Sequence, residues 1–198
     1  MDKIIPFKNL AFSGPSGAGK TTLVNRIVSF DNEKERPSLA SVKSVANEVF
    51  DRYGLKQDDR FSARFRLFLQ NKILEKQIDQ YQAVKEGNLI ISDRTPMDMA
   101  AYMMSDPFIH SEGIFMDVKT YASICASVTK RYFPNVVLVP FCIPYENSEK
   151  RPSFNISKIK HFYGVLRGLL VMGNVPFIEM PKIDGVEKRI EWLKSKGM

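Results

Sequence analysis

The stretch Gly14-Pro15-Ser16-Gly17-Ala18-Gly19-Lys20-Thr21 decides the fold that we expect for this chain. It matches the pattern G-x-x-x-x-G-K-[ST] of a phosphate-binding loop. Glycines let the backbone curl so that its amides point at phosphate oxygens, and the helix that follows aims its positive end at the same place. Lys20 reaches the β- and γ-phosphates, and the Thr21 hydroxyl is a ligand for Mg²⁺. We therefore predict that residues 14–21, together with Thr22, bind ATP and Mg²⁺.

Apolar strand patterns and helical patterns alternate along the rest of the chain. Short apolar runs bounded by turn residues predict buried strands, whereas apolar residues at helical spacing predict amphipathic helices. We expect an α/β fold: a three-layer sandwich with a mainly parallel five-stranded sheet, in a single domain spanning 1–198. The expected strands are 7–13, 38–42, 88–93, 135–142 and 175–180; the expected helices are 20–29, 44–53, 60–86 (capped by Asp58 or Asp59), 117–132, 156–172 and 186–196, with another starting at Thr95-Pro96-Met97-Asp98.

Three candidate functional segments follow the ends of the most apolar strands, which we place at Ser13, Asp93 and Cys142. The phosphate-binding loop follows the first end, Asp93-Arg94 closes the second, and the polar, charged stretch 143–156 follows the third. We interpret that stretch as a mobile lid. Because ligands of open parallel sheets bind at the carboxyl ends of the strands, the three segments should meet at one edge of the sheet.

Composition narrows the choice of partners. The formal net charge of +7 favours anionic partners such as nucleotides. No segment approaches the roughly 20 apolar residues that span a bilayer, and residues 1–10 lack the apolar centre of a signal peptide. We expect a cytoplasmic protein without a membrane partner, in which Cys125 and Cys142 are buried and reduced. The scattered histidines and cysteines do not predict a zinc site.

Other classes of nucleotide-binding protein fit this sequence less well. A GTPase switch usually carries Asn-Lys-x-Asp after a strand, whereas Asn71-Lys72 lies inside an expected helix. A ring-forming motor usually has a larger core and a hydrophobic strand that ends in adjacent acids. The corresponding strand here ends in Ser92-Asp93-Arg94, with one acid followed by a base. The Asp93-Arg94 pair is therefore the second informative signal in the chain.

With this pair at a strand end, the chain resembles the nucleoside and nucleotide kinase group of P-loop proteins. Thymidylate kinases carry Asp-Arg at this position, and deoxynucleoside kinases carry Glu-Arg. The stretch 91–102, with Asp-Arg, a later Asp and then Ala-Tyr, is also similar to nicotinamide riboside kinase domains.

The resemblance implies a catalytic set of Lys20, Asp93, Arg94 and Arg151. Asp93 would hold the acceptor hydroxyl or a Mg²⁺-bound water, which makes it a metal-site residue together with Thr21. Arg94 would bridge donor and acceptor and neutralise charge as the phosphoryl group moves. Arg151 would come from the lid onto the transferring phosphate, with Lys150 as the reserve candidate.

The acceptor would lie along the long helix 60–86 by the same resemblance. Arg64, Phe68 and Gln70 are similar to the arginine, aromatic and glutamine residues by which deoxynucleoside kinases hold a base. Aromatic faces stack on bases and an amide pairs with a base edge, although phenylalanine at helical spacing is more often part of a core.

One departure from the family concerns the general base. Deoxynucleoside and nicotinamide riboside kinases place an acid at the end of the second strand, where this chain has Lys43. Asp93 is then the leading candidate for the base, with Glu48 and Asp51 behind it. Alternatively the acceptor is a phosphate that needs no base, and Lys43 would suit a monophosphate.

Three functions stay open on this reasoning. The first, which we favour, is a kinase acting on a nucleoside or nucleoside monophosphate. The second is a kinase acting on a hydroxyl in DNA, and the third is a regulatory ATP-binding protein without transferase activity. DNA and a second copy of the chain, as in a homodimer, also stay open as partners.

Overall fold

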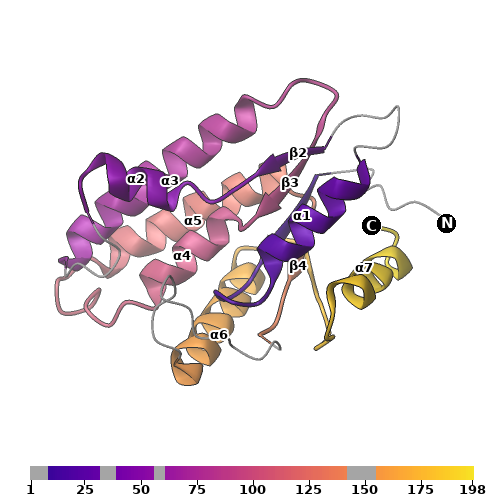
Figure 1. The fold of residues 1–198 in the computed structure, drawn as a ribbon. Helices are drawn as coiled ribbons and strands as arrows, with labels where there is room; N and C mark the ends of the chain where they lie inside the picture. The colour runs from indigo at the N-terminus through magenta and orange to yellow at the C-terminus, as the bar shows by residue number, and fades with distance from the viewer. Residues whose placement is uncertain (1–8, 32–38, 56–60, 142–154) are drawn as a thin grey trace.

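The computed structural model describes residues 9–31, 39–55, 61–141 and 155–198, and the account below concerns these residues. Its centre is a sheet of five parallel strands in the order β2-β3-β1-β4-β5 (Figure 1). The α/β fold and the five-stranded parallel sheet predicted from the sequence are confirmed. The strands are β1 (Leu10–Ser13), β2 (Leu39–Val42), β3 (Leu89–Asp93), β4 (Asn135–Leu138) and β5 (Phe177–Glu179).

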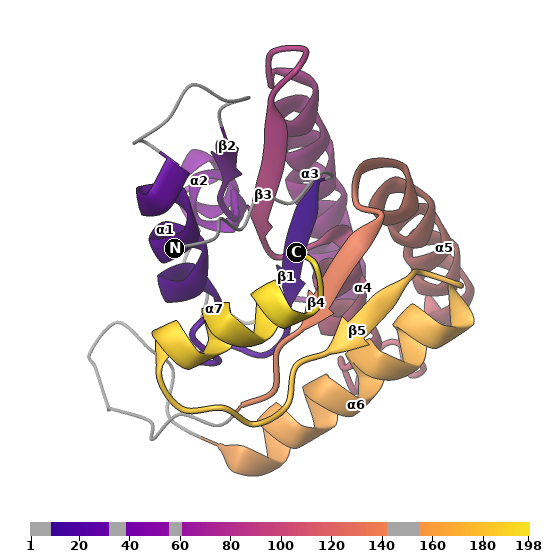
Figure 2. The same ribbon diagram turned by 90° about the vertical axis from the view of Figure 1, so that its right-hand side faces the viewer.

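Helices cover both faces of this sheet. Figure 2 shows α1 (Lys20–Asp31) and α7 (Val186–Ser195) on one side, with the helices from α3 to α6 on the other. The shorter α2 packs on α3. The remaining bounds are α2 (Ala46–Arg52), α3 (Ala63–Gln82), α4 (Pro96–Met104), α5 (Phe115–Tyr132) and α6 (Ile156–Met172).

The strands separate two hydrophobic cores by simple alternation. In β1, Leu10 and Phe12 face the core under α1 and α7, while Ala11 faces the larger core under α3 to α6. In β4, Val136 and Val137 divide in the same way. Because successive side chains of a strand point to opposite faces, continuous apolar runs are the expected sequence of a sheet that is buried on both sides.

The start of α3 differs from the prediction. The helix begins at Ala63, and its cap is Ser62, whose hydroxyl accepts a hydrogen bond from the Phe65 amide at 3.1 Å. The predicted caps, Asp58 and Asp59, lie outside the described residues. The carboxylate of Glu112 also accepts from the first amides of the helix, at 2.9 Å from Ala63. A distant acid thus shares the capping of this helix, which local sequence could not show.

The sequence of 105–116 predicted no element; in the structure this stretch is rich in turns up to residue 114 and then begins α5. Besides Glu112, it contributes Asp106, which pairs with Arg66 of α3 at 2.6 Å. Ile109 and Ile114 are buried in the larger core. The segment therefore closes the end of the α3–α5 layer.

None of the described helices is both long and apolar enough to cross a bilayer.

Candidate functional site

The phosphate-binding loop lies between the carboxyl end of β1 and the start of α1. Gly14, Gly17 and Gly19 adopt positive φ angles of 145°, 78° and 81°. Gly14 has a second constraint, since a Cβ built there would lie 2.3 Å from the carbonyl oxygen of Val139. This glycine therefore allows the loop to pass directly against the continuation of β4. In this way the loop is packed against the sheet rather than standing free of it.

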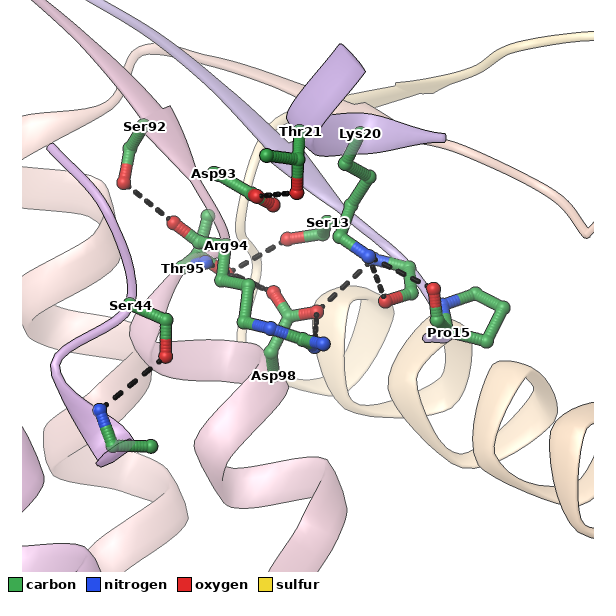
Figure 3. Close-up of polar contacts among 12 residues, drawn as sticks. Ser13, Pro15, Lys20, Thr21, Ser44, Ser92, Asp93, Arg94, Thr95 and Asp98 are labelled. Atoms are coloured by element: carbon green, nitrogen blue, oxygen red, sulfur yellow. Dashed lines mark hydrogen bonds and ion pairs between the residues drawn. The ribbon is translucent and has the colours of Figure 1, made fainter. Parts of the chain in front are cut away.

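Lys20 is buried in the loop that it closes. Its ammonium donates hydrogen bonds of 2.8 Å to the carbonyl oxygens of Gly14 and Pro15 (Figure 3). Burial, followed by the charge of Arg94, lowers the pKa of the Lys20 ammonium from 10.5 to about 7. The site thus holds a poorly solvated amine, and an incoming polyanion would favour its charged form.

Thr21 and Asp93 meet where α1 begins and β3 ends. The Thr21 hydroxyl donates to Oδ2 of Asp93, while Oδ1 is buried without a hydrogen-bond partner among the described residues. A hydroxyl and a carboxylate oxygen are the hard donors that Mg²⁺ prefers, and Mg²⁺ keeps most of its remaining ligands from water and phosphate. No cluster of three or more His, Cys, Asp or Glu occurs in the described part of the chain. The residues present therefore fit Mg²⁺ bound with a nucleotide rather than in an all-protein cage.

Arg94 is held in an unusual backbone conformation. Its φ is +91°, a value that costs a residue other than glycine roughly 1–3 kcal/mol. Two hydrogen bonds hold it there: its amide donates to Phe12 at 2.9 Å, and its carbonyl accepts from the Ser92 hydroxyl at 2.7 Å. Burial opposes the charge of Arg94, but Tyr102, Asp98 and Asp93 outweigh it and raise the pKa of the guanidinium. The strained turn thus delivers a permanent cation to the phosphate-binding loop.

Asp98, which the sequence placed at a predicted helix start, joins these parts. Its fully buried carboxylate accepts from the Thr95 amide at 2.9 Å, which caps α4. The other oxygen accepts from the Gly14 amide at 3.0 Å and lies 3.6 Å from Nη1 of Arg94. One carboxylate therefore ties the loop, the arginine and the start of α4 together. The sequence signal for it was the spacing of four residues after Arg94.

A second tie comes from Arg189, which the sequence analysis missed. This residue of α7 is buried, and its Nη1 donates to the carbonyl oxygen of Ala18 at 2.7 Å, while Nε donates to Ile183 at 2.8 Å. The guanidinium therefore supports the loop from behind. A charged position on the apolar face of a closing helix was the only signal in the sequence.

The predicted acceptor residues lie at the end of β2 and on α3. Lys43 is exposed just beyond β2, and Arg64 and Phe68 are exposed on α3. Gln70 is half-buried, and its backbone carbonyl accepts from the Tyr121 hydroxyl of α5 at 3.0 Å. The general expectation that phenylalanines at helical spacing belong to the core is wrong for Phe68, which is 41% exposed.

Several predicted residues lie outside the described structure. These are Lys150, Arg151, Cys142 and nearly all of the proposed lid 143–156. The other cysteine, Cys125, is buried and free as predicted, and burial raises the pKa of its thiol to about 12. Ser16, Gly17, Ala18, Gly19 and Thr22 occupy the loop and the first turn of α1, as the motif predicted.

Comparisons with known proteins show the family and the fold of this chain. A family model described as an AAA domain matches residues 9–189. The chain belongs to this family. A comparison with curated protein sequences finds no match. Among solved structures, this AAA domain is similar to a thymidylate kinase from Ehrlichia chaffeensis, with a TM-score of 0.64 and 14% identity over 96% of this chain and 98% of the other. The AAA domain described here thus has the P-loop fold of the nucleotide kinases, as its resemblance to that group implied.

Proposed function

We propose that this protein is a kinase that transfers the γ-phosphoryl group of ATP to a nucleoside or nucleoside monophosphate. One observation carries the proposal: Lys20, Thr21, Asp93 and Arg94 come together at the carboxyl edge of the sheet (Figure 3). A nucleotide-binding loop alone would serve many functions. A buried lysine facing an acid and an arginine from the neighbouring strand is an arrangement suited to phosphoryl transfer, because its catalysis is mostly positioning and charge stabilisation.

Each residue of the site has a role in phosphoryl transfer that follows from its position. The loop amides and Lys20 hold the β- and γ-phosphates, and Arg94 neutralises charge on the transferring group. Thr21 and Asp93 would hold Mg²⁺, which would reduce the negative charge on the phosphate oxygens. Arg151 and Lys150 stay predictions for the side of the phosphate that faces the lid.

The base that removes the proton from an acceptor hydroxyl is less well determined than the groups that bind phosphate. One buried oxygen of Asp93 has no hydrogen-bond partner in the part of the chain that the structure describes, which supports its candidacy as the base. Glu48 is ion-paired with Lys76 at the surface, and Asp51 is exposed, so neither competes well. Lys43 projects from the end of β2, beside the strand that carries Asp93, where a cation would suit a monophosphate acceptor. A phosphate acceptor is already ionised and needs no base.

A second acceptor class, a hydroxyl in DNA, is favoured by a specific surface. Tyr53, just after α2, and Phe65 of α3 are exposed, and their rings contact that of the exposed Phe68 at 5.9 and 5.8 Å. Lys72 lies over the Phe68 ring at 5.9 Å. Exposed rings next to cations can stack the bases of a single strand as well as a free base.

Labelled ATP offered with a panel of nucleosides, nucleoside monophosphates and oligonucleotides tests the proposal. We expect label on a nucleoside or a monophosphate. Label on oligonucleotides alone would replace the leading acceptor with DNA. Label on nothing, together with measurable ATP binding, would replace the kinase by a regulatory ATP-binding protein.

Nucleotide binding should weaken as pH rises from about 7 to 9. Free Lys20 is largely neutral above its pKa of about 7, and a bound polyphosphate requires the ammonium. Binding therefore takes up roughly one proton at about pH 8.5, so that affinity falls with rising pH. Calorimetry with ADP in two buffers of different ionisation heat measures the proton count. The Lys20→Met variant should show none of this uptake, and an equal uptake in that variant would assign the proton to another group.

A further inference from the structure

The guanidinium of Arg94 lies beside a carboxylate and an aromatic ring. Oδ1 of Asp98 is 3.6 Å from Nη1, and the centroid of the Tyr102 ring is 5.5 Å from Cζ. Nη1 is buried and has no hydrogen-bond partner among the described residues. The three residues follow one another at intervals of four, from the strained turn into α4.

The Tyr102 ring is itself fixed from behind. Phe162 of α6 is buried, and its ring centroid lies 4.6 Å from that of Tyr102 at an angle of 41°. Tyr102 nevertheless keeps 44% of its surface exposed. An aromatic ring packed by a second ring is a rigid surface, and a cation over the face of such a ring is attracted by its quadrupole.

We propose that Tyr102 is a positioning residue that holds the Arg94 guanidinium in its catalytic direction. The inference rests on the proposed phosphoryl transfer and adds a residue to it. Asp98 already binds the Gly14 amide and Thr95, so its carboxylate is anchored where it attracts the arginine from 3.6 Å. The ring attracts the same cation. Together the two contacts hold the guanidinium, and Nη1 stays 3.6 Å from the Asp98 carboxylate, beyond hydrogen-bonding distance.

Loss of the Tyr102 ring removes one of the two contacts that hold the Arg94 guanidinium. In a Tyr102→Leu variant the guanidinium would turn toward Asp98 and pair with it more closely. Its N–H groups would then hydrogen-bond the Asp98 carboxylate instead of the phosphoryl group that is being transferred. Because Arg94 acts on developing charge, the change should appear in kcat more than in the binding of either substrate.

Steady-state kinetics of Tyr102→Leu and Tyr102→Phe test the proposal. We expect Tyr102→Leu to lower kcat by about tenfold or more, with the Kd of ATP and the KM of the acceptor within about threefold of wild type. Tyr102→Phe keeps the ring but removes the hydroxyl, which also hydrogen-bonds Arg94, so its kcat should lie between those of wild type and Tyr102→Leu. Tyr132→Leu is a matched control, since Arg131 lies over Tyr132 at 5.7 Å beside Asn9, at the opposite end of β1. It should not lower kcat at a temperature at which the variant is folded.

A double-substitution cycle separates positioning from direct contact. If Tyr102 acts through Arg94, Tyr102→Leu should have no further effect on kcat in an Arg94→Ala background. Effects that multiply, or an acceptor KM that rises with kcat unchanged, would overturn the proposal and assign Tyr102 to the acceptor. Loss of activity in Tyr102→Phe equal to that in Tyr102→Leu would also overturn it, because the ring would then not be the active feature.

A spectroscopic readout keeps the inference separate from the proposed function. If no acceptor is phosphorylated by the wild type, the proposed function fails, but the Nε–Hε resonance of Arg94 can still be followed by ¹⁵N NMR. The ring current of Tyr102 should shift that resonance, the shift should persist in Tyr102→Phe, and it should disappear in Tyr102→Leu. An Arg94 resonance unaffected by Tyr102→Leu would show that the ring does not hold the guanidinium.

Discussion

Replacement of Lys20 by methionine should reduce the rate of phosphoryl transfer by about 10³-fold or more. Losses of this size are typical when a charged group that stabilises the transferring phosphoryl group is removed. The methionine fills the space of the side chain but supplies no charge to the β- and γ-phosphates. Binding of ATP should weaken as well, since the buried ammonium lies inside the loop that would hold the phosphates. Initial rates with labelled ATP, and the ATP-induced rise in melting temperature, measure the two effects.

The fold of this variant should survive. The free protein carries the cost of burying an amine whose pKa is lowered to about 7, and methionine removes that cost. The variant should therefore melt within a few degrees of wild type without ATP, and should gain little from ATP, whereas wild type gains about 2.7 kcal/mol at a hundred times its Kd. Lys119→Met, at an exposed position of α5, is the matched control and should behave as wild type. Undiminished transfer in Lys20→Met would end the argument for a nucleotide site at this loop.

Replacement of Gly14 by alanine should cause the largest loss of stability among single substitutions in the loop. The new Cβ would lie 2.3 Å from the Val139 carbonyl oxygen, and the residue would keep a φ of +145°. Strain of this kind costs roughly 1–3 kcal/mol, and the overlap adds to it because the obstructing atom is backbone. We expect a loss of about 3 kcal/mol, which lowers the melting temperature of a chain of this size by about 6–12 °C. Thermal unfolding followed by circular dichroism measures the shift.

Gly164→Ala provides the matched control for this prediction. Gly164 lies inside α6 on an exposed face, and a Cβ there would meet no atom within 4 Å. Alanine at such a helical position should stabilise by up to about 1 kcal/mol. If both alanine variants melted at the temperature of wild type, the close approach of the phosphate-binding loop to β4 would be wrong.

The sequence alone determined the class of fold and the identity of the phosphate-binding loop. Apolar runs bounded by turns have few alternatives to buried strands when helical patterns separate them, so the sheet followed from local pattern. The loop was equally local, because its glycines, Lys20 and Thr21 are consecutive. The pairing of that loop with Asp93 and Arg94 followed from one rule, since parallel strands present their carboxyl ends at the same edge.

Only the tertiary structure decided which distant residues support that edge. The sequence placed Asp98 at the start of a helix, but its hydrogen bond with Gly14 depends on the register between β1 and β3, which no local pattern encodes. Arg189 donates a hydrogen bond to Ala18, from which it is separated by 171 positions in the sequence. Phe68 is exposed although its helical spacing favours a core position, because spacing alone does not determine whether a neighbouring element covers the ring. Propensity and motif act between residues near in sequence, whereas burial and buried charge depend on what the fold brings alongside.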